Sequence, residues 1–229
     1  MPEYSSDITV KLVRAMAADD YVVQAAQVSA KGENNPNTVP ERLIASLMTH
    51  RHGSPFEHGC FTFFIEAPIF VIREWQRHRM SSFNEMSGRY TTLQPKFYLP
   101  SINRPTLNTG SSMQPHMVCD ESHKDLILES TVMVTTKAWN TYQDKLKAGV
   151  ANEVARMDLP LSIYSQMYWT VNPRSLMNFL SLRVESDESL VKSYPQREIN
   201  YGADKVEEIF SEIMPITHKC FVDNGRVAP

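Results

Sequence analysis

The sequence has few of the residues that build the common nucleotide cradles. Only 8 of its 229 residues are glycine, and no glycines form a GxGxxG or GxxxxGK pattern. This excludes the usual Rossmann and P-loop phosphate sites. The GxSxG elbow of serine hydrolases is absent as well. If the protein binds a dinucleotide, arginines and helix ends must hold it.

Cysteines and long apolar runs are scarce too. Cys60, Cys119 and Cys220 stand in unrelated contexts without a CxxC pair, which excludes a closed disulfide framework and indicates a reducing compartment. The longest mostly apolar stretch, residues 61–72, is interrupted by Glu66 and Pro68 and is far shorter than the ~20 residues that cross a bilayer. The first ten residues lack a basic region and an apolar run. We therefore expect a cytoplasmic protein, located in the host cytoplasm if the source is viral.

The charge balance excludes an excess of basic residues. Lysine and arginine together number 23 and aspartate and glutamate 26, so the formal net charge is -3. Proteins that wrap long nucleic acids neutralise many phosphates with lysine and arginine. We therefore expect no polymeric nucleic acid partner and no membrane partner, and any anion site must be local.

The hydrophobic pattern predicts an α+β fold in which helices pack on a mixed or antiparallel central sheet. The expected strands are residues 7–15, 60–66 and 164–171. The expected helices are residues 20–30, 40 to about 50, 69 to about 79, 126–149, a short one at 152–156, one opened by Asn172-Pro173, and 196–214.

No internal repeat, low-complexity tract or composition shift divides the chain. We therefore expect a single catalytic domain over residues 1–229. Prolines, glycine and serines punctuate the segment from Leu99 to His123, and this predicts a long loop that is mobile over residues 101–123.

The most unusual segment is Arg73 to Tyr90, REWQRHRMSSFNEMSGRY. It holds four arginines and no lysine, and planar guanidinium groups suit shaped recognition of phosphate or carboxylate. On a helix to about Arg79, Arg73 and Arg77 would lie one turn apart, as would Glu74 and His78. Surface ion pairing explains this composition equally well, but the polar run that follows the helix could wrap an anion.

Three further arginines are candidates for anion binding, and two of them have an ion-pair alternative. Asn172-Pro173-Arg174 is typical of a helix start, where free N–H groups and an arginine can bind a phosphate. Arg183 lies in an apolar run and needs an acceptor; from spacing alone, a salt bridge to Glu185 or Glu188 is favoured. For Arg156, a solvated pair with Glu153 is favoured in the same way.

A third group has residue types that could bind zinc, namely His50, His52, His58 and Cys60. No second ligand pair follows at a matching interval, and Arg51 stands between the first two histidines. We therefore expect no metal site, and a helix-capping or ligand-touching histidine is favoured. A metal-dependent phosphohydrolase that uses these histidines and an RNA-binding module remain the alternatives from other functional classes.

The residues also resemble a known family. Arg77-His78-Arg79 followed after seven residues by Ser87 resembles the signature of flavin-dependent thymidylate synthase. The similarity extends to HGSPFEH (residues 52–58), APIFVIREW before the signature, and EVAR, LPL and WTVNPRSLMNFLSLR (residues 153–183), over about half of the chain. Two positions depart from the pattern: Glu74, where some relatives have glutamine, and Tyr194, where histidine is usual.

The resemblance implies an enzyme that methylates dUMP to dTMP, with 5,10-methylenetetrahydrofolate as carbon donor, reduced FAD as hydride donor and NADPH as reductant. It also implies a homotetramer with shared active sites. The residues implied to contact the flavin are Ser54, Arg77, His78, Arg79, Glu85, Asn172, Arg174 and Asn178. Those implied to surround dUMP are Glu74, Arg77, Glu85, Ser87, Arg89, Arg156 and Arg183.

The sequence offers no cysteine in a Pro-Cys-His setting, so a thiolate that adds to the uracil ring is not expected. We expect Arg183 to be the catalytic residue, stabilising the negative charge that grows on the N3 and O4 edge of uracil. We expect Arg89, Ser87 and Arg156 to hold the phosphate and His52 to border the folate. No base stands at an obvious spacing from Ser87, which favours a binding role over a nucleophilic one.

Overall fold

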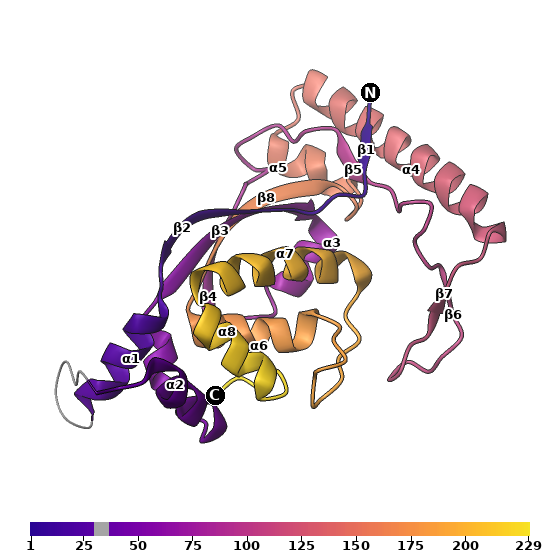
Figure 1. Cartoon of the computed structure of the whole chain (residues 1–229). Helices are drawn as coiled ribbons and strands as arrows, with labels where there is room; N and C mark the ends of the chain where they lie inside the picture. Colours follow the sequence, from indigo (N-terminus) through magenta and orange to yellow (C-terminus); the bar gives the residue numbers. More distant parts are fainter. Residues whose placement is uncertain (30–36) are drawn as a thin grey trace. The chain divides into compact units, whose positions relative to one another are not determined.

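The structure is a computed structural model that describes residues 1–29 and 37–229. The chain contains runs of strands and runs of helices rather than a strict alternation of the two, which confirms the α+β class (Figure 1). It forms two compact units, which we call unit 1 (Met1–Asp7, Glu66–Arg73 and Glu85–Met167) and unit 2 (Ile8–Ile65, Glu74–Asn84 and Tyr168–Pro229). The single catalytic domain stays a prediction.

Unit 1 is built around one long helix, α4, which spans Ser122–Lys147 and realises the helix expected over 126–149. Its buried cluster consists of Leu93, Phe97, Trp139, Tyr142, Ala155 and Ile163. The Tyr142 hydroxyl also accepts the Leu93 N–H at 3.1 Å, so the loop that contains Leu93 is fixed to α4 by a buried hydrogen bond. The other elements of this unit are β1 (Glu3–Ser5), β5 (Lys96–Tyr98), β6 (Leu107–Asn108), β7 (Met117–Val118), α5 (Asn152–Ala155) and the 3-10 turn η2 (Arg156–Asp158).

Unit 2 holds a four-stranded antiparallel sheet in the order β2-β3-β8-β4, and the ends of the last three of these strands belong to unit 1. The strands are β2 (Thr9–Met16), β3 (Cys60–Pro68), β8 (Tyr164–Val171) and β4 (Ser81–Glu85). Helices α6 (Pro173–Arg183), α7 (Arg197–Ile213) and α8 (Pro215–Asp223) lie together beside the sheet (Figure 1). The remaining elements of the unit are α1 (Asp19–Val28), α2 (Pro40–Thr49) and η1 (Ser54–Glu57).

Aromatic side chains fill the space between this sheet and its helices. Trp75 packs edge-on against Trp169 of β8, with ring centroids 5.5 Å apart, and stacks on Phe179 of α6 at 4.9 Å. All three are fully buried. A Cβ at Gly202 would lie 2.8 Å from the Trp75 ring, so only glycine lets α7 approach this closely. The Trp75 side chain is therefore held firmly in the core, directly before the segment that carries the predicted site residues 77–79.

Most predicted elements of this unit are confirmed. The strands over 7–15, 60–66 and 164–171 appear as β2, β3 and β8, and the helix over 196–214 appears as α7. Asn172 caps α6 as expected, because its side-chain oxygen accepts the Ser175 N–H at 2.8 Å. The helix expected over 20–30 appears as α1, and the predicted last residue, Ala30, lies outside the described residues.

The prediction of a helix to about Arg79 is wrong. The helix, α3, spans only Ile69–Trp75. The N–H groups of Arg77 and His78 bond to carbonyls three residues back, and the Ser81 hydroxyl donates to the His78 carbonyl at 2.6 Å. These turn contacts replace helical bonding, so Arg73 and Arg77 do not form a row on one helix, nor do Glu74 and His78.

Several helices and strands of the structure were not predicted from the sequence. β1 pairs in parallel with β5, with Tyr4 opposite Phe97, and β6 pairs antiparallel with β7 inside the segment expected as a loop. The mobility of residues 101–123 stays a prediction. Helix α8 follows α7 directly at Pro215. None of the described helices is long and apolar enough to cross a bilayer.

A buried ion-pair network ties α7 to the C-terminal segment. Both terminal nitrogens of Arg226 donate to the Glu207 carboxylate, at 2.8 and 2.7 Å, and His218 bonds to the same carboxylate at 2.8 Å. Burial alone would raise the pKa of Glu207, but the hydrogen bonds from His218 and Arg226 outweigh it and lower the pKa to about 2. Glu207 is thus ionised throughout the physiological range.

We expect Arg226→Met to lower the free energy of unfolding by about 3 kcal/mol, because it removes one partner of a buried pair. Since the folded pKa of Glu207 lies below the ordinary 4.5, its contribution is complete above pH 4.5 and is lost as the pH falls toward 2. Urea unfolding of wild type and Arg226→Met tests the loss of stability, and urea unfolding of wild type and Glu207→Gln at several pH values tests its pH dependence. The exposed Glu212→Gln on the same helix is the control. A wild-type advantage that does not change below pH 4.5 would contradict the network.

Candidate active site

The predicted site residues divide between the two units, and each unit brings a subset of them together. Unit 2 contains Glu74, Arg77, His78 and Arg79, with Arg183 at the end of α6. Unit 1 contains Glu85, Ser87, Arg89 and Arg156. The polar run after α3 therefore contributes to both groups.

Arg183 is the centre of the unit 2 group. Its Nε–H donates to His78 Nε2 at 3.1 Å, and its Nη1 donates to Glu74 Oε2 at 2.9 Å. A longer contact of 3.4 Å joins Nη2 to the Glu74 carbonyl. The side chains of Arg183 and Glu74 are only 19% and 26% exposed. The salt bridge expected to Glu185 or Glu188 is therefore wrong: the partner is Glu74, which is distant in sequence.

Burial perturbs both partners of this arginine. Desolvation raises the pKa of Glu74, Arg183 opposes the rise, and the nearby charge of Glu198, a buried residue of α7, adds to it. Desolvation, helped by the Arg183 charge, lowers the pKa of His78 to about 4. His78 is therefore neutral at pH 7, and its ring can accept a hydrogen bond from a cation. Perturbed groups of this kind are typical of functional sites.

A small hollow of about 170 Å³ opens next to this group. His78, Arg79 and Ser81 line it from the turn and β4, and Ser175 and Asn178 line it from α6. The Arg79 guanidinium offers hydrogen-bond donors to this space, whereas the Ser81 hydroxyl already donates to the His78 carbonyl and the Asn178 amide uses one N–H on the Arg174 carbonyl. Ser175 was not predicted as a site residue, although its position one residue after Arg174, on the first turn of a capped helix, is a signal that points to it.

Two residues predicted to contact the flavin have other partners. Arg174 donates to Glu57 Oε1 at 2.5 Å and to the Pro229 carbonyl at 2.7 Å, and its guanidinium packs on Gly53 beside Ser54. A Cβ at Gly53 would lie 2.4 Å from the guanidinium carbon, so this approach requires glycine. Asn172 uses its side chain to cap α6. Ser54 and Arg174 are thus neighbours, whereas Arg174 is not among the residues that line the hollow.

The unit 1 group is more open. Arg89 donates to Glu153 Oε2 at 3.0 Å, and both side chains are 53% exposed. The Ser87 hydroxyl accepts the Arg89 N–H at 3.3 Å, and the Arg156 side chain lies close enough that a Cβ at Gly88 would be 3.3 Å from its Cδ. The pair expected between Arg156 and Glu153 is therefore wrong, because Glu153 binds Arg89. Two guanidinium groups and a hydroxyl gather around one loop.

The histidines show no metal-binding arrangement. Among residues 1–29 and 37–229, no three or more His, Cys, Asp or Glu side chains are placed to hold a metal ion. His50 Nδ1 instead donates to the Ser46 carbonyl at 2.8 Å at the end of α2, which confirms the expected helix-capping histidine. The His52 ring lies 6.3 Å from that of His50. The described residues thus give no support to the phosphohydrolase alternative.

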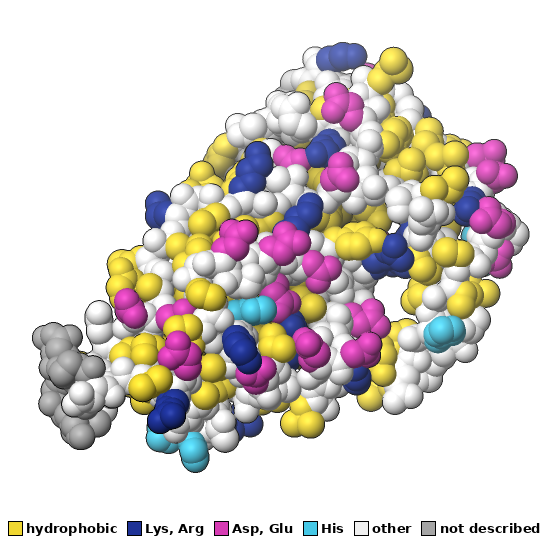
Figure 2. All heavy atoms as spheres, in the orientation of Figure 1, with side chains coloured by type: hydrophobic (Ala, Val, Ile, Leu, Met, Phe, Trp, Pro, Cys, Tyr) yellow, Lys and Arg dark blue, Asp and Glu magenta, His cyan; other side chains and the backbone are white. Residues whose placement is uncertain are grey.

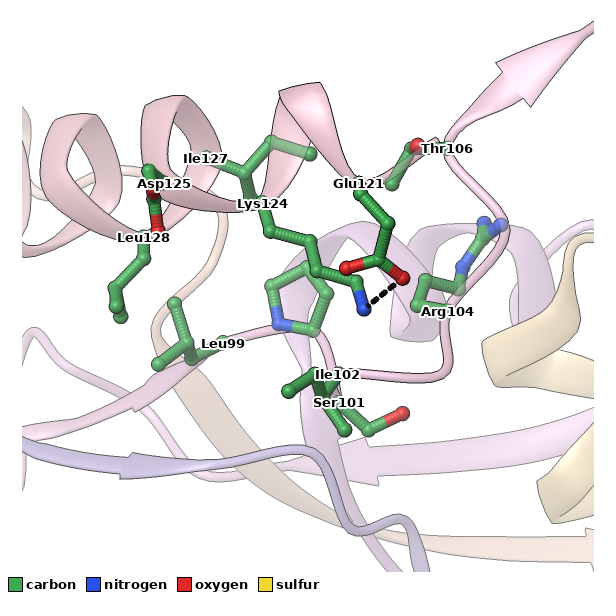
Figure 3. Close-up of a pocket in the computed structure, with 11 residues that line it drawn as sticks. Leu99, Ser101, Ile102, Arg104, Thr106, Glu121, Lys124, Asp125, Ile127 and Leu128 are labelled. Carbon is green, nitrogen blue, oxygen red and sulfur yellow. Dashed lines mark hydrogen bonds and ion pairs between the residues drawn. The ribbon is translucent and has the colours of Figure 1, made fainter. Parts of the chain in front are cut away.

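A larger hollow of about 440 Å³ lies in unit 1, between residues 99–106 and the first turns of α4. Its walls are largely apolar, and the paired Lys124 and Glu121 side chains meet in it at 2.6 Å (Figure 3). None of the predicted site residues lines it. Figure 2 shows acidic and basic side chains interspersed on the face drawn, rather than gathered in the basic stripe that an RNA-binding module would use.

Comparison with known proteins gives one consistent result. The family model "Thymidylate synthase complementing protein" matches residues 11–216. The "Flavin-dependent thymidylate synthase" of Tropheryma whipplei (strain TW08/27) is 47% identical over an alignment of 234 residues. The alignment covers 100% of this chain and 98% of that protein. The protein of the same name from Streptomyces coelicolor is 48% identical over 236 residues, 99% of this chain and 96% of its own length.

A solved structure is similar over its whole length. The UMP/dUMP methylase PolB from Streptomyces cacaoi, bound with 5-Br UMP, has a TM-score of 0.94 and 40% identity, with 100% of both chains covered. Its complex with 5-Br dUMP has a TM-score of 0.90 and 40% identity, and the match covers 99% of this chain and 100% of that one. Both complexes hold a uracil nucleoside monophosphate analogue.

We expect the Arg89–Glu153 pair to contribute less than about 1 kcal/mol to stability, because both side chains are half exposed. A double-mutant cycle with Arg89→Ala and Glu153→Ala, measured by urea unfolding, gives the coupling energy. The partly buried Arg183–Glu74 pair, taken through the same cycle, is the comparison and should couple more strongly. An equal or larger coupling for Arg89 and Glu153 would mean that Arg89 is held too firmly to be released to an anion.

Proposed function

Because the chain belongs to the thymidylate synthase complementing protein family, we propose that it is a flavin-dependent thymidylate synthase, a methyltransferase. It converts dUMP to dTMP with methylenetetrahydrofolate as carbon donor and without a cysteine nucleophile. The observation that carries this proposal is the Arg183 group, in which a largely buried guanidinium meets Glu74 and His78 of the signature segment.

The chemistry requires C5 of uracil to become nucleophilic. A fixed cation beside the N3 and O4 edge would stabilise the negative charge that develops there, and such a group is most effective where water is excluded. Arg183 has the required properties, since it is largely buried and its orientation is set by at least two partners. We assign it the catalytic role.

The described residues fit a flavin in part. The hollow lined by His78, Arg79, Ser81 and Asn178 supplies donors for ring carbonyls or a pyrophosphate, but 170 Å³ is less than the ~300 Å³ or more of a pocket for a whole ligand. We therefore assign these residues to one portion of FAD, and Ser54, Arg77, Glu85, Asn172 and Arg174 to others. Bound and reduced, the flavin would supply the hydride for the transferred carbon.

The phosphate of dUMP fits the open unit 1 group. Arg89 and Arg156 offer guanidinium forks and Ser87 a hydroxyl, and the exposed Arg89–Glu153 pair can exchange its partner at little cost. Glu74, Arg77 and Glu85 complete the nucleotide contacts in this proposal. Because Ser87 Oγ accepts the Arg89 backbone N–H, and no base stands at an obvious spacing from it in the sequence, we keep it in a binding role.

The remaining assignments follow from the family. We propose NADPH as the reductant, His52 as a residue that borders the folate, and a cytoplasmic homotetramer whose active sites are shared between subunits. The similarity to PolB favours one second candidate, a methylase that accepts UMP as well as dUMP. The two candidates differ only in whether the ribose 2′-hydroxyl is tolerated.

We expect purified protein to be yellow with flavin absorbance and to form dTMP from dUMP, methylenetetrahydrofolate and NADPH. Product analysis by chromatography, run in parallel with dUMP and UMP, separates the two candidates, since methylated UMP would favour the broader activity. A colourless protein that still forms dTMP, or a yellow protein that methylates neither nucleotide, would refute the proposed reaction.

We expect Arg183→Ala to lower kcat about 10²–10³-fold while flavin remains bound, because it removes the stabilising cation without touching the hollow's donors. Flavin content comes from absorbance and kcat from dTMP formation. Arg42→Ala, at an exposed arginine of α2 in the same unit, is the control and should leave both unchanged. Near-normal turnover in Arg183→Ala would remove this residue from the mechanism.

A further inference from the structure

We propose that His78 is a positioning residue for Arg183: its ring nitrogen Nε2 accepts the Arg183 Nε–H and thereby sets the plane of the guanidinium. The inference rests on the proposed function, because it concerns how Arg183 would meet the uracil ring. It adds a second role for His78 beside the flavin contact that the family resemblance implies.

The hydrogen-bond geometry carries the proposal. A planar guanidinium held at one nitrogen can still rotate about that contact, whereas contacts at two nitrogens define its plane. Glu74 holds the terminal nitrogens, and His78 holds Nε at 3.1 Å. Arginine has five N–H bonds; His78 and the two oxygens of Glu74 engage three, which leaves two for a substrate.

The His78 ring is itself fixed. Its edge packs on Phe179, with centroids 4.9 Å apart and ring planes at 72°, and Phe179 stacks in turn on the fully buried Trp75. The Ser81 hydroxyl holds the His78 carbonyl at 2.6 Å. Because its ring and its backbone are held by these contacts independently of Arg183, His78 can set the orientation of the Arg183 guanidinium.

The protonation state agrees with an acceptor role. Nε2 can accept the Arg183 N–H only if it carries no proton, and burial together with the Arg183 charge lowers the pKa of His78 to about 4. At pH 7 the ring proton therefore lies on Nδ1, the other nitrogen.

The position of His78 also connects two parts of the proposed site. The residue lines the 170 Å³ hollow together with Arg79 and Asn178, and it touches Arg183. A ligand in that hollow would therefore contact the residue that orients the proposed catalytic cation.

The test compares two substitutions in the holoenzyme. His78→Phe keeps a planar ring but cannot accept a hydrogen bond, whereas in His78→Gln the amide oxygen can take the place of Nε2. We expect His78→Phe to lower kcat for dTMP formation about 10- to 100-fold, with a smaller change in the KM for dUMP. His78→Gln should recover most of this loss. His50→Gln, at an exposed helix-capping histidine, is the control and should behave as wild type.

A double-mutant cycle separates positioning from flavin contact. If His78 acts through Arg183, His78→Phe should lower kcat by less than about twofold in the Arg183→Ala background. The same factor in both backgrounds would overturn the inference, as would a His78→Gln variant no more active than His78→Phe. Flavin absorbance of each variant shows whether the loss comes from a missing cofactor, which would also overturn it.

One measurement does not depend on activity or on the folding of a variant. Nitrogen-15 NMR of the wild-type histidines at pH 7 should show His78 with a proton on Nδ1 and none on Nε2. A proton on Nε2 would refute the hydrogen bond even in an active enzyme. A wild-type protein without flavin or dTMP formation refutes the proposed function instead, and the two failures are thus distinguishable.

Discussion

The candidate site depends on the Arg183 guanidinium, which is largely buried at the end of α6 and must be surrounded by hydrogen-bond acceptors. Removing a cation from water is costly unless acceptors surround it. Arg183 obtains them from the carboxylate and carbonyl of Glu74 and the ring of His78, and the C-terminal end of the helix dipole adds a favourable field. Arg183 keeps these contacts only if Glu74 and His78 both reach the end of α6.

That requirement explains the local structure of the signature segment. Its helix ends at Trp75, whose ring is locked between Trp169 and Phe179, and a turn stabilised by Ser81 brings His78 back toward α6. The aromatic core and the polar site are thus directly connected. The packing of Trp75 and Phe179 fixes the residues that bind the Arg183 guanidinium.

The sequence predicted what depends on local pattern and missed what depends on distant partners. Rough alternation identified β2, and the Asn172-Pro173 cap identified the start of α6, because both signals are local in the sequence. Spacing assigned Arg183 to Glu185 or Glu188, but its partner is more than a hundred residues away. The parallel pairing of β1 with β5 likewise joins distant segments through three residues each, too few for a periodic signal. The family signature pointed to these arginines without indicating their partners, and their roles stay a proposal.

The arginines of the two groups differ in a way that suits different tasks. Arg89 is half exposed and held by one exchangeable carboxylate, which suits an incoming phosphate, since a substrate anion can replace Glu153 without reorganising a core. Arg183 is held at several nitrogens in a largely dry setting, which suits charge that exists only during reaction, because preorganised donors need not move when it appears. If Arg89 were buried and Arg183 exposed, neither arginine would suit its proposed task. A rigid, buried arginine would admit the phosphate slowly, and an exposed one would lose its effect on the ring to solvent screening.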